Sequence, residues 1–251
     1  MEGRSPDLSG VPETMLWSLY HRAAESYRAD RVLHDPEGVR IMEALDYDFA
    51  GHFGTPGGSL AARAAEMDRT IVRWLGRHPD GLVVSLGEGL ETQALRVDNG
   101  RMRWLSVDLP EAIRLRENFL PPTERFRHLA KSALNPEWMA AVDASGPSLI
   151  VAQGLLMYLE PDAVGRLVGG MAERLPDAGL LFDTIPPWLS ELTLRGLNLT
   201  PRYRLPRMPW GIARDDIEPT LRRWCPRHDR HADPAQPCAE PGGHQLRRMP
   251  G

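Results

Sequence analysis

A glycine-containing turn after an apolar run is the first feature of this sequence that could bind a ligand. Residues 82–86 are almost continuously apolar, and Gly87-Glu88-Gly89 follows them directly. Glycine lets the backbone approach a ligand closely because it has no side chain to obstruct the contact. A dinucleotide fingerprint would need a third glycine where Thr92 stands, and Glu88 and Glu91 would repel a pyrophosphate. The turn therefore suits a ligand other than a phosphate, unless it is only a tight turn.

An acidic residue, Asp108, ends the next apolar run, about 20 residues after the glycine turn. In nucleotide-binding sheets, an acid at this place accepts hydrogen bonds from two ribose hydroxyls. It also opposes a phosphate on the same ribose. Asp108 could instead cap the helix predicted to start at Pro110, and the two roles are compatible. The glycine turn and the acid together predict a nucleoside site.

A third polar position follows a later apolar run. Gln153 comes directly after residues 149–152 and is followed by the mostly apolar residues 154–159. A polar side chain at this place could contact both a cofactor and a substrate. By periodicity alone, packing of a turn explains the segment better.

These positions must be placed by a scaffold of alternating strands and helices. Short apolar runs at 82–86, 104–107, 149–152 and 180–182, with a weaker one at 126–130, predict strands. Helical patterns at 110–119, 136–142 and 161–175 separate them, and a strongly amphipathic one at 59–75, which Ser59 could cap, precedes them. Such alternation indicates a parallel sheet covered on both faces, with ligands bound beyond the carboxyl ends of its strands. We predict the α/β fold class, with a Rossmann-like sheet.

The chain divides into four predicted parts. Residues 1–58 form an N-terminal helical cap, with a helix start at Asp35-Pro36, and residues 59–190 form the Rossmann-like core. Residues 191–224 form a substrate-side or lid segment. Residues 225–251 lack periodicity and are expected to form a flexible tail.

Composition excludes several classes of function. The chain has 251 residues, with 30 basic and 34 acidic side chains and a net charge of -4. This balance disfavours nucleic-acid and membrane-surface roles. We find no apolar run long enough to cross a bilayer and no secretory signal, so we expect a cytoplasmic protein. The histidines, among them His21 and His228, and the two cysteines do not have metal-site spacing, so we expect no metal.

The motifs at Gly87–Gln93, Val107–Pro110 and Gln153–Leu159 resemble the leucine carboxyl methyltransferase family, and more narrowly its bacterial branch of tetracenomycin-type polyketide O-methyltransferases. The resemblance runs from about residue 16 to residue 188. It implies a Rossmann-like methyltransferase fold with S-adenosylmethionine as the methyl donor.

The resemblance also implies which residues bind the cofactor. The glycine turn, with Gly87, Glu88 and Gly89, is expected at the methionine part, and Asp108 at the ribose. Arg63 is expected to hold the cofactor carboxylate, and Arg22 falls on a second basic position. The remaining two positions are the adenine side, at Ser132 and Ala133, and the ammonium side, at Gln153.

This sequence departs from the family pattern in three places. Glu91 and Gln93 stand where the family has Asp and Arg, so an ion pair between those positions is absent or rebuilt. Gln153 replaces a glutamate and gives up the attraction to the cofactor's ammonium. The two strands that usually end such folds are not apparent after Trp224.

The predicted reaction is methyl transfer to a carboxylate or phenolic hydroxyl of a small molecule, such as a polyketide-type metabolite. No residue is a compelling general base, which favours an acceptor that is already ionised. Two alternatives remain: a weakened or non-catalytic methyltransferase-like binding protein, and an NAD-dependent oxidoreductase, which Thr92 and Glu88 disfavour. The sequence does not indicate catalytic residues or an oligomeric state.

Overall fold

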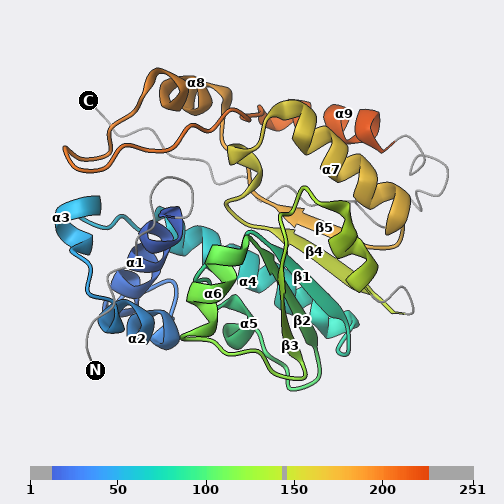
Figure 1. Cartoon of the computed structure of the whole chain (residues 1–251), viewed down its shortest axis with the longest axis horizontal. Helices are drawn as coiled ribbons and strands as arrows, with labels where there is room; N and C mark the ends of the chain where they lie inside the picture. The colour runs from blue at the N-terminus through green and yellow to red at the C-terminus, as the bar shows by residue number, and fades with distance from the viewer. Residues whose placement is uncertain (1–12, 143–145, 226–251) are drawn as a thin grey trace.

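A five-stranded parallel sheet forms the centre of the protein (Figure 1). The computed structural model describes residues 13–142 and 146–225, so the predicted tail and its histidines lie almost entirely outside the described residues. The strand order is β3-β2-β1-β4-β5. The strands confirm all five predicted runs: β1 (Leu82–Leu86), β2 (Arg103–Asp108), β3 (Phe126–Ala130), β4 (Ser148–Ala152) and β5 (Gly179–Phe182).

The strand order defines where a ligand can bind. The chain moves outward from β1 through β2 to β3 and then crosses back to place β4 on the other side of β1. In open parallel sheets, ligands bind beyond the carboxyl ends of the strands at such a reversal. The glycine turn follows β1 and Gln153 follows β4, so both lie at the reversal. The predicted α/β, Rossmann-like fold class is confirmed.

Helices cover both faces of the sheet. On one face, Val83 and Val151 pack with Ile71 of α4 (Ser59–Arg77), and the short α5 (Gln93–Arg96) lies on the same face. On the other, Val84 and Ile150 pack against α7 (Pro161–Arg174) and the 3-10 helix η1 (Pro136–Ala141). The nearly continuous apolar strands follow from this burial on both sides.

Three helices form the N-terminal cap: α1 (Thr14–Ser26), α2 (Pro36–Ala44) and α3 (Phe49–Phe53). They lie together on one side of the sheet, next to α6 (Pro110–Glu117) (Figure 1). Asp35 begins α2 as predicted, because its side chain accepts a hydrogen bond from the Gly38 N–H. α1 reaches the end of β1, where a Cβ on Gly89 would lie 2.7 Å from Met15 Cβ.

Three local predictions need correction. Ser59 is not the cap of α4, because Gly58 occupies that position and no side chain caps the helix. The segment after Pro136 is a 3-10 helix rather than an α-helix. Beyond β5, two helices were not predicted, α8 (Pro187–Arg195) and α9 (Arg214–Trp224).

The segment between α8 and α9 returns to the core rather than remaining at the surface. Tyr203, Leu205 and Met208 are buried in the same apolar cluster as the cap helices. Trp210 packs with Phe182 at the end of β5. Residues far apart in the sequence therefore enclose the carboxyl edge of the sheet.

Candidate active site

The glycine turn and Asp108 are in direct contact. The Gly89 N–H donates a hydrogen bond of 2.7 Å to Asp108 Oδ2, and the Leu109 N–H donates one of 2.7 Å to Oδ1. Asp108 does not cap α6, since Leu109 occupies that position. Burial raises the pKa of Asp108, and these two backbone donors oppose the shift. The acid predicted for a ribose is thus held against the turn predicted for the methionine part.

The two glycines of the turn are required by conformation and by space. Gly87 has φ 64° and Gly89 has φ 55°, both in the left-handed region that other residues rarely adopt. A Cβ on Gly87 would lie 2.8 Å from Leu155 Cδ1, and one on Gly89 would meet Met15. Backbone at the end of β1 is therefore enclosed between α1 and the segment after β4.

Glu88, between these glycines, has its carboxylate inside the protein. Arg116 Nη2 lies 3.1 Å from its Oε1, and Trp104 Nε1 donates a hydrogen bond of 3.2 Å to its Oε2. Burial raises the pKa of Glu88, and Arg116 opposes the shift. Arg116 Nη1 also donates to the carbonyl oxygens of Gly89 and Glu91. The side chain of Glu88 therefore fixes the shape of the turn, and only its backbone faces the predicted cofactor site.

Arg22 is likewise committed to the protein. It lies 3.0 Å from Asp35 and 3.0 Å from Glu91, and its Nη2 donates a hydrogen bond to the carbonyl of Leu90. The side chain is 1% exposed. Arg22 thus joins the cap to the end of the glycine turn, and a direct contact with a cofactor carboxylate stays a prediction.

Arg96 is an ion-pair partner of Glu91, since position 93 holds a neutral glutamine. Its guanidinium lies 2.8 Å from Glu91 and 2.7 Å from Asp68 of α4. Gln93 instead donates a hydrogen bond of 2.8 Å to Asp68. In this chain the cation beside Glu91 is thus Arg96, three residues after Gln93.

Gln153 belongs to the same buried network. Its Nε2 donates a hydrogen bond of 3.0 Å to Glu91 Oε2, and its Oε1 accepts one of 3.3 Å from Gln93. The amide that departs from the family pattern thus has a carboxylate as its partner. A glutamate at this position would face Glu91 directly.

Arg63 lies at the same edge of the sheet, beyond β4. Its Nη1 is 3.1 Å from Asp183 Oδ2, and a Cβ on Gly154 would lie 3.2 Å from both of its terminal nitrogens. The Gly154 N–H donates a hydrogen bond of 2.6 Å to Asp183 Oδ1. Asp183, directly after β5, therefore orients Arg63. Arg63 Nε is buried with no hydrogen-bond partner in the described part of the chain, which fits a ligand carboxylate.

Ser132 and Ala133 follow β3 at the same edge, where Ala130 is paired with Asp108. The Ser132 hydroxyl accepts a hydrogen bond from the Leu134 N–H, and the Ala133 carbonyl accepts one from Trp138 Nε1. Both residues thus lie on the Asp108 side of the site. All nine predicted positions lie on the segments that surround the carboxyl ends of β1 to β4, and direct contacts with a cofactor stay predictions.

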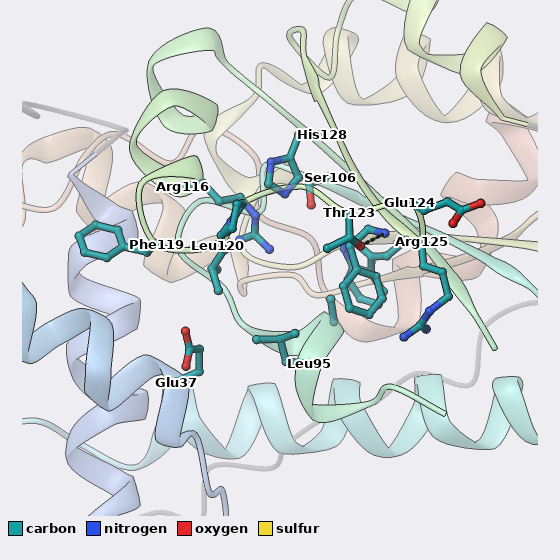
Figure 2. Close-up of a pocket in the computed structure, with 14 residues that line it drawn as sticks. Glu37, Leu95, Ser106, Arg116, Phe119, Leu120, Thr123, Glu124, Arg125 and His128 are labelled. Atoms are coloured by element: carbon teal, nitrogen blue, oxygen red, sulfur yellow. Dashed lines mark hydrogen bonds between the residues drawn. The ribbon is translucent and has the colours of Figure 1, made fainter. Parts of the chain in front are cut away.

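A cavity of about 600 Å³ lies on a neighbouring part of the molecule. Figure 2 shows its lining, with Arg116 extending toward the centre between His128, Ser106 and Leu120. None of the nine predicted residues lines it, and none lines a second cavity of about 330 Å³.

Neither a metal-ion cluster nor a membrane-spanning helix is found in residues 13–142 and 146–225. Within these ranges, no three histidine, cysteine or acidic side chains are grouped in a way that could hold a metal ion. No helix there combines the length and apolar character required to span a membrane.

The sheet reversal, the glycine turn bonded to an acid at the end of β2, and the α4 arginine that lies against Gly154 are typical of the nucleoside-binding α/β enzymes to which Rossmann-like methyltransferases belong. A solved structure of a DUF574 family protein from Streptomyces avermitilis has a similar fold, with a TM-score of 0.50, 15% identity and 80% coverage of each chain.

The family follows from the sequence comparisons. A family model described as leucine carboxyl methyltransferase matches residues 15–172. The tetracenomycin polyketide synthesis O-methyltransferase TcmP of Streptomyces glaucescens is 31% identical over 84% of this chain and 78% of its own length. The S-adenosyl-L-methionine-dependent methyltransferase dpfgK of Gibberella zeae is 26% identical over 69% of this chain and 64% of its own length. The chain belongs to the leucine carboxyl methyltransferase family, and it is an S-adenosylmethionine-dependent methyltransferase.

Proposed function

We propose that this enzyme transfers a methyl group to an oxygen atom of a small-molecule acceptor, a carboxylate or a phenolic hydroxyl on a polyketide-type compound. The observation that carries the proposal is the 2.7 Å contact between Gly89 and Asp108, with Arg63 beyond the neighbouring strand. The printed name of TcmP, an O-methyltransferase of polyketide synthesis, supports both the oxygen acceptor and its chemical class.

Each predicted residue has a role in this proposal. Asp108 accepts hydrogen bonds from the ribose, and Arg63, held by Asp183, binds the methionine carboxylate. The backbone of the glycine turn lies along the methionine part, and Ser132 and Ala133 border the adenine. Gln153 is placed at the ammonium, and Arg22 supports the turn from behind.

The protein contributes mainly alignment. S-adenosylmethionine supplies a methyl group on a positively charged sulfur, which an acceptor oxygen can displace in line. Holding the two reactants in the right geometry can lower the barrier by up to about 7–11 kcal/mol. The cap and the segment after α8, which enclose the carboxyl edge of the sheet, are placed to exclude water from the reaction.

The test is calorimetric titration of S-adenosylmethionine into the Asp108→Ala variant. We expect affinity to fall at least about tenfold, since a hydrogen bond to a charged group contributes about 1.5–3 kcal/mol. Asp98→Ala is the matched control, because Asp98 carries a partly exposed ion pair with Arg125. Equal affinity in wild type and Asp108→Ala, with both folded by circular dichroism, would refute the proposed site.

A second experiment separates an enzyme from a binding protein. Metabolites incubated with the enzyme and the methyl donor are compared by mass spectrometry, and a mass gain of one methylene identifies the acceptor. Binding of labelled donor without methylation of any extract metabolite would favour the non-catalytic alternative. Quenching of protein fluorescence by reduced nicotinamide cofactor would revive the oxidoreductase alternative.

A further inference from the structure

Four buried polar atoms without partners belong to one group of side chains. They are Trp17 Nε1, His21 Nε2, Arg63 Nε and the Tyr203 hydroxyl, and none of them has a hydrogen-bond partner among the described residues. The Trp17 ring centre lies 5.6 Å from that of His21 and 6.2 Å from that of Tyr203, and Arg63 acts electrostatically on His21. Because a buried polar atom without a partner is costly, such a group marks a place where a ligand supplies the missing bonds.

The imidazole of His21 has a defined orientation. Its Nδ1 lies 2.8 Å from the carbonyl oxygen of Gly57. A carbonyl only accepts hydrogen bonds, so Nδ1 carries the proton and Nε2 presents a lone pair. Burial lowers the pKa of His21, the hydrogen bond to Gly57 opposes this shift, and Arg63 adds to it; the net lowering favours the neutral ring near pH 7. His21 is 7% exposed, so this lone pair is buried.

The group lies on the β4 side of the candidate site. Thr14, Trp17 and His21 follow one another at steps of three and four residues, on one face of α1. The Thr14 side chain bonds to Tyr158 after β4, and Arg63 lies against Gly154 at the end of β4. The group therefore lies on the side of the site away from Asp108 and the predicted ribose.

The chemistry of the group matches one kind of acceptor. A hydroxyl needs a partner that accepts its proton, which His21 Nε2 can do, whereas a carboxylate would meet that lone pair with lone pairs of its own. Trp17 Nε1 can donate to the acceptor oxygen. Burial raises the pKa of Tyr203, which keeps its hydroxyl protonated as a second donor. The aromatic rings of Tyr203 and Phe53, 4.7 Å apart, suit an aromatic ligand.

We propose that Trp17, His21 and Tyr203 form the binding site of the methyl acceptor, that this acceptor is an aromatic hydroxyl compound, and that His21 Nε2 removes the hydroxyl proton. This inference rests on the proposed function and narrows its acceptor class to phenols. It also supplies the general base that the sequence did not reveal.

The step balances with the reactants already named. The hydroxyl oxygen forms a bond to the methyl carbon, while the bond between that carbon and sulfur breaks and its electron pair stays on sulfur. The hydroxyl proton moves to His21 Nε2 and is released to water after the methyl ether leaves. A phenol with a pKa near 10 needs such a base at neutral pH, and an ionised acceptor does not.

Three naphthalene compounds distinguish an acceptor that needs a base from one that does not: 1-naphthol, 4-nitro-1-naphthol and 1-naphthoic acid. At about pH 8, 1-naphthol is protonated, whereas the other two are ionised. We expect His21→Gln to lower the methylation rate of 1-naphthol about a hundredfold, with kcat affected more than KM, and that of 4-nitro-1-naphthol less than about threefold. His78→Gln, near the far end of α4, is the control and should leave both rates unchanged.

A measurement on the wild-type protein does not depend on turnover. Nitrogen NMR of His21 in the S-adenosylhomocysteine complex should show an unprotonated Nε2 that shifts when 1-naphthol binds but not with 1-naphthoate. Failure of S-adenosylhomocysteine to bind would overturn the proposed function itself. If S-adenosylhomocysteine binds, an Nε2 signal that does not change with saturating 1-naphthol would overturn the present inference. It would also be overturned if no probe binds, or if His21→Gln lowers the rates of the two naphthols equally.

Discussion

The side chain of Gln153 donates a hydrogen bond of 3.0 Å to the carboxylate of Glu91. These two residues, at the ends of neighbouring strands, are both departures from the family pattern. Position 91 is acidic in the family pattern as well, so the change at position 153 gives this carboxylate a neutral hydrogen-bond donor where the family has a second acid. The two positions are therefore coupled through this hydrogen bond.

Restoring the family's glutamate alone should weaken the protein. Gln153→Glu would bring a second carboxylate against Glu91, within a network where Arg22 and Arg96 already face more acids than they can balance. We expect the unfolding free energy at about pH 8 to fall by on the order of 3 kcal/mol, as for other uncompensated buried charges. Urea denaturation measures this loss. The double variant with Glu91→Gln should recover most of it, and a single variant as stable as wild type would contradict the coupling.

Arg96 should contribute far more to stability than a surface arginine. It is 9% exposed and neutralises Glu91 and Asp68. Arg96→Met keeps most of the volume but leaves these carboxylates unpaired, so we expect a loss of about 3–5 kcal/mol in urea denaturation. Arg101→Met removes an ion pair with Asp80 in which Arg101 is 60% exposed, and should cost less than about 1 kcal/mol. Similar losses in the two variants would show that the buried network is not stabilising.

A glycine can be required by its positive φ or by the lack of space for a Cβ, and a pair of variants separates these two requirements. Gly89 and Gly100 both have positive φ, 55° and 79°, but a Cβ on Gly100 would meet no atom within 4 Å. Gly100→Ala should therefore cost only the backbone strain of about 1–2 kcal/mol. Gly89→Ala adds a clash with Met15, which raises the loss by about 1–3 kcal/mol, and should also abolish calorimetric binding of S-adenosylmethionine. Equal losses of stability and retained binding would contradict the close packing of the turn.

Because Asp35 and Arg22 form a buried ion pair, the free energy of unfolding should decrease at low pH. Burial by itself would raise the pKa of Asp35, but Arg22 and Arg96 outweigh it and lower that pKa. The carboxylate then stabilises the fold above its unfolded-state pKa of about 3.9, and the contribution is lost as pH falls through the folded-state pKa. Asp35→Asn should thus be much less stable than wild type at about pH 7, with a difference that shrinks below about pH 4. A difference independent of pH would exclude this ion pair as its cause.

Local patterns in the sequence predicted the strands of the sheet, the glycine turn after β1 and the acid at the end of β2. Apolar runs of the right length predicted all five strands, because a strand buried on both faces needs apolar residues at nearly every position. Gly87, Gly89 and Asp108 were found for a related reason: a left-handed turn and a strand-end acid have strict local requirements. The unpredicted α8 and α9 show the limit, since α9 contains Pro219, which is unusual inside a helix, and its apolar residues Leu221 and Trp224 are only partly buried against the core.

The partners of the polar side chains were decided only by the tertiary structure. Glu91 and Gln153 are 62 residues apart, and Arg63 and Asp183 are 120 residues apart. A short motif contains no information about such distant neighbours, so the sequence could not show that Arg22 and Glu88 are held inside the protein or that Asp183 orients Arg63. The same holds for His21, whose free nitrogen depends on the carbonyl of Gly57 at one side and on Arg63 at the other. The amino-acid order determined which elements form and where glycine is required, whereas chain folding decided which charges are neutralised and which remain available for chemistry.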